Sequence, residues 1–144
     1  MQNPPPVQTS SQPPAQVAKS STGLDENVAA LLSYIAGWIT GLVFFLIEKD
    51  SRLVRFHAMQ SLILSGGGLV IIIALWIFIA ISSFIIGQIS TLLSFLVSTI
   101  LFLVVSVVGI AILIGAIIGL VKAYQGQYFK LPVIGNLAEK FSTK

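Results

Sequence analysis

The chain has 144 residues, of which 56% are hydrophobic and only 9% are charged, with eight Lys and Arg against five Asp and Glu. Because about a quarter of the residues in soluble domains are charged, this composition excludes an ordinary soluble domain and indicates an integral membrane protein. The sequence contains no cysteine, which excludes disulfide bonds, thiol chemistry and cysteine-ligated metals.

The first 23 residues form a tail rich in Pro, Gln and Ser. It holds five of the six prolines and shows no apolar periodicity. Such a segment has too little apolar surface to offset its chain entropy. We therefore expect residues 1–23 to be disordered and a transmembrane domain to occupy residues 24–141.

Three apolar segments follow the tail, and each has the length of a transmembrane helix. A hydrocarbon core of about 30 Å requires about 20 helical residues. We expect spans at about 28–47, 58–86 and 92–121, with the polar segment 87–91 between the last two. The sequence thus predicts an all-α polytopic membrane protein with three transmembrane helices.

Four spans are the alternative, because residues 58–121 are uncharged and could hold three short helices. With three spans, seven of the eight Lys and Arg fall on one side of the membrane and only Lys19 on the other, whereas four spans divide them three to five. The positive-inside rule favours the uneven division. We therefore expect a multi-pass protein of the cell membrane, with residues 48–61 and the C-terminus in the cytoplasm and the tail outside.

Two polar segments are expected at the membrane boundary. Residues 48–61 hold five charged residues and the only histidine, and they predict an amphipathic polar turn before the second helix. The C-terminal segment mixes Tyr124, Tyr128 and Phe129 with lysines, as is typical of the headgroup region. Residues 133–141 are expected to form a short interfacial helix.

Small residues at a spacing of four predict close helix packing in the first and third spans. In lipid, helices associate through such small residues because there is no hydrophobic drive between them. The two spans run parallel in the three-span topology, and we expect their ridges to pack on each other within one chain, or alternatively between two copies. The ridges are Ala29, Ser33, Gly37 and Gly41, and Ala111, Gly115, Gly119 and Ala123.

A polar face on the second helix supplies the candidate functional residues, as an interaction surface or the lining of a polar path: Arg55, His57, Gln60, Ser61 and Ser65. His57 is expected at the interface, where a structural hydrogen bond is favoured over a proton or ligand role. One histidine without cysteines is a poor metal site. No Ser-His-Asp arrangement or phosphate-binding loop is present, so we expect no catalytic residue, metal or cofactor, and no enzyme.

Several motifs stand in and around the polar segments: Tyr34-x-x-Gly37-Trp38, Glu48, Val54-Arg55-Phe56-His57-Ala58, Gln60-Ser61, Ala123-Tyr124-Gln125-Gly126 and Leu131-Pro132-Val133-Ile134-Gly135. With them the chain resembles a family of small prokaryotic membrane proteins of unknown function, related to the chloroplast inner-envelope import component Tic-twenty. The resemblance covers about residues 25–141. It implies membrane residence and a part in protein translocation or complex assembly. The import component is expected to have four spans, whereas the charge distribution here favours three.

We therefore expect a non-enzymatic membrane protein that acts as an interaction or assembly subunit. Its partners would be the lipid bilayer and a membrane protein or a second copy of the chain. Nucleic-acid binding is not indicated, because no basic stripe lies on a soluble module. The alternative is a small transporter or pore subunit with a polar path along the second helix.

Overall fold

The computed structural model describes residues 18–142, which fold into helices joined by short loops. The expected all-α fold is confirmed for this part of the chain, where an isolated bridge joins Lys19 to Asp25 and no strand is found. Of the tail expected to be disordered, residues 1–17 lie outside the described residues, and residues 18–25 form turns and bends.

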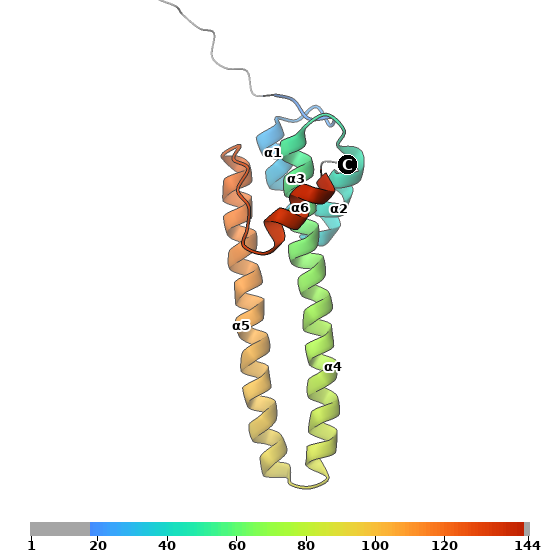
Figure 1. Ribbon diagram of the computed structural model, residues 1–144, viewed down its shortest axis with the longest axis vertical. Helices are drawn as coiled ribbons and strands as arrows, with labels where there is room; N and C mark the ends of the chain where they lie inside the picture. The colour runs from blue at the N-terminus through green and yellow to red at the C-terminus, as the bar shows by residue number, and fades with distance from the viewer. Residues whose placement is uncertain (1–17, 143–144) are drawn as a thin grey trace, which may run out of the picture.

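Two long antiparallel helices run nearly the whole length of the molecule (Figure 1). The first is continuous and consists of α3 (Arg52–Ser61), the π-helical segment η1 (Leu62–Gly67) and α4 (Gly68–Gly87). The second is α5 (Thr91–Tyr124). At 36 and 34 residues, both are long and apolar enough to cross a bilayer. They contain the spans expected at 58–86 and 92–121, and the first begins earlier because residues 52–61 of the expected polar turn are helical.

Glycine and serine residues bring α4 and α5 together. A Cβ atom added at Gly68 would lie 2.6 Å from Cδ1 of Ile112, so the absence of a side chain permits this close approach. Near the hairpin turn, the hydroxyls of Ser83 and Ser98 lie 2.7 Å apart, and Ser94 donates to the carbonyl of Ser83 at 3.0 Å. Small residues and hydroxyl hydrogen bonds are what hold helices together in lipid.

The expected first span over residues 28–47 is not confirmed, because the helical run breaks in its middle. α1 (Glu26–Leu32) has seven residues, and α2 (Trp38–Ile47) starts after a turn. Gly37 in this turn has a φ of 58°, in the left-handed region that favours glycine. α2 has ten residues, which at 1.5 Å each give about 15 Å, half of a hydrocarbon core of about 30 Å. The described residues thus hold two helices of spanning length, not three or four.

α1 and α2 form a helical hairpin, so the residue that follows α2 lies close to the residues that precede α1. Four close contacts fix the direction of each helix: Asn27 with Gly126, Tyr34 with Gly119, Gly37 with Ser65, and Gly41 with Ala58. α1 therefore runs antiparallel to α5, where three spans required parallel helices, and α2 runs antiparallel to α3. The two ends of the α1–α2 hairpin lie together, since the backbone N–H of Ser21 donates to the Glu48 carboxylate at 3.0 Å.

The short helices gather at one end of the molecule (Figure 1). We call this unit, residues 18–65 and 115–142, the head, and the two-helix remainder, residues 66–114, the stalk. One core cluster of the head joins α1, α3 and α5 through Ala29, Ala30, Tyr34, Leu53, Val54 and Ala123. The expected C-terminal helix is present as α6 (Ile134–Ser142) and packs through Ala138 on Phe56 and Met59.

The positive charges of the described chain all lie in the head. They are Lys19, Lys49, Arg52, Arg55, Lys122, Lys130 and Lys140. The stalk carries no charged residue over residues 66–114. Lys19, which three spans placed opposite the other cations, therefore lies at the same end of the molecule as the rest.

Candidate functional site

A buried polar network occupies the centre of the head, between α3 and residues 125–131. Its side chains belong to Tyr34, His57 and Gln60, which are 5%, 0% and 0% exposed. The Tyr34 hydroxyl lies 3.3 Å from Nδ1 of His57, and Nε2 of His57 lies 2.9 Å from the carbonyl oxygen of Gln127. Because a carbonyl can only accept, we assign the proton to Nε2, which leaves Nδ1 to accept from Tyr34.

Gln60 completes the network through both the nitrogen and the oxygen of its side-chain amide. Its Nε2 donates to the Tyr34 hydroxyl at 3.0 Å and to the carbonyl of Phe129 at 3.2 Å. Its Oε1 accepts from the backbone N–H of Leu131 at 3.3 Å. Every donor in this set thus has an acceptor, as a buried polar network requires.

His57 and Gln60 therefore hold residues 125–131 against the helix. Their spacing of three puts both side chains on one face of α3. The structure brings these two predicted site residues together, but inside the head, where they have no contact with solvent. The same two residues were expected to form an exposed contact site or line a polar path.

Two further predicted site residues support the turn between α1 and α2. Ser61 donates to the carbonyl of Gly37 at 3.1 Å, and Ser65 donates to the carbonyl of Ser61 at 2.7 Å. A Cβ at Gly37 would lie 3.0 Å from the Ser65 hydroxyl oxygen. Thr40 also donates to the carbonyl of Ser33 at 3.0 Å across the turn. The hydroxyls of Ser61 and Thr40 thus satisfy carbonyls that the helix break leaves open, whereas the Ser65 hydroxyl bonds a carbonyl of its own helix.

The small residues expected to form two packing ridges are divided among several contacts. Ala29, Ser33 and Ala123 are buried in the head, and Gly37 and Gly41 face α3 and η1 rather than α5. A Cβ at Gly119 would meet the Tyr34 ring at 2.7 Å, whereas one at Gly115 would meet Leu64 at 3.5 Å. Ala111 is exposed in the stalk. Gly119 and Ala123 alone of the second ridge pack against α1 or its adjoining turn.

A buried carboxylate joins the two ends of the α1–α2 hairpin. Glu48 is 1% exposed. Its oxygens accept from the backbone N–H groups of Ser21, Asp50 and Ser51 at 2.8 to 3.1 Å, and the Ser21 hydroxyl lies 2.8 Å away. Burial raises the pKa of Glu48, but these hydrogen bonds outweigh it and hold the pKa below its ordinary value.

We expect the stability of the head to fall in acid because of Glu48. A carboxyl whose pKa is lowered by folding contributes stability above its unfolded pKa, and this contribution is lost as the pH falls through the folded pKa. Glu48→Gln should lower the free energy of unfolding by about 2 kcal/mol near neutral pH and flatten the decline below the ordinary value of 4.5. Thermal unfolding in detergent at several pH values measures both effects. Asp25→Asn, at an exposed ion pair, is the control, and an equal effect there would contradict the prediction.

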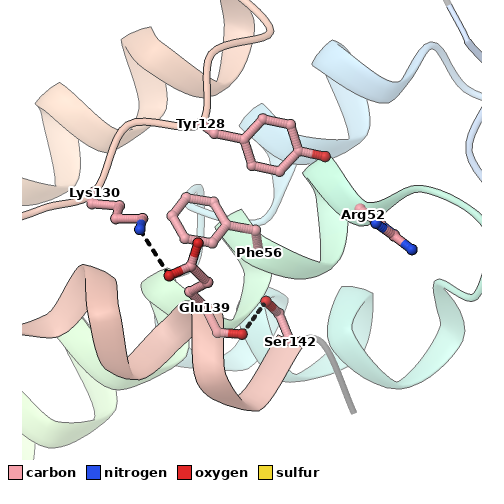
Figure 2. A pocket seen from close by; sticks show the side chains of 6 residues that line it. All are labelled: Arg52, Phe56, Tyr128, Lys130, Glu139 and Ser142. Carbon is pink, nitrogen blue, oxygen red and sulfur yellow. Dashed lines mark hydrogen bonds and ion pairs between the residues drawn. The ribbon is translucent and has the colours of Figure 1, made fainter.

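A cavity of about 360 Å³ opens on the surface of the head, between α3, the segment before α6, and α6 itself (Figure 2). Its lining combines cations, aromatic rings, a carboxylate and a hydroxyl: Arg52, Phe56, Tyr128, Lys130, Glu139 and Ser142. The rings of Phe56 and Tyr128 have centroids 5.7 Å apart, and Lys130 pairs with Glu139 at 2.7 Å. Burial, with a contribution from Glu26, raises the pKa of Tyr128, so its hydroxyl stays a hydrogen-bond donor at neutral pH.

A second cavity of about 340 Å³ adjoins the first and shares Arg52 and Ser142 with it. Lys49, Asp50 and Arg55 complete its lining. The Arg55 guanidinium lies 5.4 Å from the centroid of the Phe45 ring, within cation–π range. Arg55 is thus the one predicted polar site residue that lines an open cavity.

Sequence reasoning missed Arg52, Tyr128 and Lys130 as site residues. Tyr128 and Lys130 are separated from Arg52 by more than 70 positions in the sequence, so no local spacing joins them. One sequence signal did point to this segment: the mixture of tyrosines and lysines after residue 121, which predicted a segment at the headgroup region of the membrane. The same residues assigned there to lipid headgroups line the cavity on the head.

The magnetosome magnetite crystal formation protein family is described by a family model that matches residues 23–138. This range extends from the start of the head, through the stalk, to α6. The chain belongs to this family. Within residues 18–142, no group of three or more His, Asp or Glu could hold a metal ion.

The chain is also similar to archaeal membrane proteins. A UPF0132 membrane protein of Methanocaldococcus jannaschii is 41% identical over 88% of this chain and 96% of its own length. A second from the same organism is 38% identical over 83% of this chain and 71% of its own length. A UPF0132 membrane protein of Archaeoglobus fulgidus is 42% identical over 81% of this chain and 95% of its own length. No solved structure matches the chain.

These relatives confirm the expected small prokaryotic membrane protein family and membrane residence. The relation to Tic-twenty and a part in protein translocation stay predictions. The side chains of the Arg-Phe-His-Ala-x-Gln motif, which carried the resemblance, are buried or partly buried in the head. In this member of the magnetosome magnetite crystal formation family, that motif joins α3 to the C-terminal segment.

Proposed function

We propose that this protein is a non-enzymatic assembly subunit that anchors a rigid head at one membrane face and docks an acidic protein partner there. The cavity in Figure 2 is the observation that carries the proposal. Arginine and aromatic side chains dominate the energetics of protein interfaces, and here Arg52, Phe56 and Tyr128 lie together at an open surface. With the adjoining cavity, the lining holds four cations and two carboxylates, which favours a negatively charged partner.

The buried network supports this function by making the docking surface rigid. Tyr128 and Lys130 stand on the segment that His57 and Gln60 hold against α3. A partner then binds a surface that is already ordered, and it pays little conformational entropy on binding.

The membrane arrangement that we propose has two spans, α3 with α4 and α5, and a hairpin of α1 and α2 that enters only one leaflet. The cations of the head favour its placement on the cytoplasmic side. The outward side chains of α2 are apolar and exposed, among them Ile39, Val43 and Leu46, and they suit contact with lipid chains. Tilt and an interfacial position of the turn between α4 and α5 accommodate the excess helix length.

A transporter or pore is less well supported. Of its proposed lining, His57, Gln60 and Ser61 are at most 1% exposed, and all three bond to protein groups. Opening a path along them would require these hydrogen bonds to break. The description of the family as acting in magnetite crystal formation offers a setting in which an assembly subunit could serve, and the proposal assigns no iron chemistry to the chain.

Paired tyrosine variants test the docking site. Tyr128→Ala removes a cavity residue, whereas Tyr124→Ala removes a tyrosine of similar exposure, 61% against 58%, that does not line the cavity. We expect a membrane partner to co-purify in mild detergent with the wild type and with Tyr124→Ala, and the affinity of Tyr128→Ala to be roughly tenfold lower. Equal recovery with both variants, or solute flux through proteoliposomes of the purified protein, would contradict the proposal.

A further inference from the structure

The two halves of the molecule have different widths. At the level of the head, α1 and α2 lie beside α3 and α5, whereas the stalk consists of α4 and α5 alone (Figure 1). A helix with its side chains is about 10 Å across. Four helices therefore occupy roughly twice the cross-section of two, and the protein has the outline of a wedge.

The depth of the α1–α2 hairpin sets where the wide part ends. The turn at Gly37 contacts Ser65, which is thirteen residues after the start of α3 at Arg52. At 1.5 Å per residue, the hairpin reaches about 20 Å below the start of that helix. Measured from Arg55, the last cation before the uncharged stretch, this is about 15 Å, the thickness of one leaflet.

The surface of the hairpin indicates that lipid surrounds it. Along α2, the exposed fractions are 51% for Ile39, 48% for Val43 and 66% for Leu46. The stalk surface is apolar in the same way, with Val70 at 67% and Ile77 at 56%. Because this apolar surface continues from the stalk onto α2, both belong to the hydrocarbon region, and the extra width of the head lies inside the leaflet and not above it.

We propose that the protein bends the bilayer, or gathers where it is already bent, so that the leaflet holding the head becomes convex. A wedge inserted from one side expands that leaflet more than the other, and convex curvature relieves the difference in area. This inference rests on the one-leaflet placement of α1 and α2 proposed above, but it does not require a docked partner.

Purified protein in vesicles tests the wedge directly. Phosphatidylcholine vesicles containing phosphatidylglycerol would be prepared in a small, highly curved size and a large size. The reporter is Thr22→Cys, made in a chain that contains no other cysteine. A membrane-impermeant maleimide labels it only in molecules whose head is outside, and in all molecules once detergent is added. The ratio of the two signals gives the fraction of molecules with the head outside. We expect the ratio of head-out to head-in molecules to be roughly threefold higher in small vesicles, as a population shift toward the favoured curvature. Electron cryomicroscopy should also show smaller mean diameters as the protein-to-lipid ratio rises.

Variants on α2 test whether the α1–α2 hairpin causes the orientation bias in small vesicles. Val43→Lys with Leu46→Lys should expel α2 from the hydrocarbon and abolish the bias, whereas Val43→Ile with Leu46→Ile should keep it. Hydrogen exchange of residues 127–136 reports whether the head of the lysine variant stays folded. Equal orientation ratios in both vesicle sizes with the wild type, and unchanged diameters, would overturn the inference without any variant. That result would leave the docking proposal standing. Labelling of residues 22 and 49 on opposite membrane faces, by contrast, would overturn the one-leaflet placement of α1 and α2, on which the docking and the curvature proposals both depend.

Discussion

Gln60→Ala is expected to release the C-terminal segment from the head. The substitution removes the acceptor of the Leu131 N–H and the donor to the carbonyl of Phe129 and the hydroxyl of Tyr34. All these contacts are buried or partly buried, and a buried polar group left without a partner costs about 1–3 kcal/mol. The summed effect should be on the order of 3 kcal/mol.

Hydrogen exchange in detergent measures this release at the bonds concerned. We expect the amide of Leu131 and its neighbours in residues 127–136 to exchange roughly a hundredfold faster, because each 1.4 kcal/mol corresponds to a factor of about ten. The stalk should keep its protection, since Ser83, Ser94 and Ser98 are untouched. Gln125→Ala, at an exposed glutamine, is the matched control. Wild-type exchange at Leu131 in Gln60→Ala would contradict the network described above.

Labelling of single cysteines should place both ends of the α1–α2 hairpin on one side of the membrane. The variants are Thr22→Cys, Lys49→Cys and Gln88→Cys, made in a chain that contains no cysteine of its own. With two spans and a cytoplasmic head, a membrane-impermeant maleimide applied to intact cells should label residue 88 and spare residues 22 and 49. The effect is all or none, because each site lies on one face or the other.

The same three variants distinguish the two-span topology from the three-span topology. Three spans would expose residue 22 together with residue 88, on the face opposite residue 49. The structure instead brings Ser21 within hydrogen-bond distance of Glu48 and Asp50. Labelling of residue 22 from outside the cell would therefore contradict the hairpin, and permeabilised cells provide the control that all three sites can react.

Much of the fold could be predicted because its causes are local. The uncharged stretch of residues 58–121 required long apolar helices, and Gln88 to Ser90 offered the polar break at which they turn. The short helix expected near the C-terminus is present as α6. Hydropathy and charge act within a few neighbouring residues, so they are readable without knowing the tertiary fold.

The candidate site could be predicted only in its residue types. The sequence singled out Arg55, His57 and Gln60, but their partners are the carbonyls of Gln127 and Phe129 and the ring of Phe45. Two of these partners lie about 70 positions away along the chain. A polar face on a helix looks the same in sequence whether solvent, a solute path or another segment of the protein satisfies it.

The sequence by itself determined the membrane class, the two long helices and the concentration of positive charge in the segments that flank them. Only the tertiary structure decided that residues 28–47 turn back at Gly37 rather than form one continuous helix. Glycine at this position permits a φ of 58°, but one glycine does not stop an apolar helix. The Ser61 hydroxyl donates to the Gly37 carbonyl and stabilises the turn. The Glu48 carboxylate accepts from the residues at both ends of the hairpin and holds these ends together. Those contacts exist only once α1, α2 and α3 have packed together.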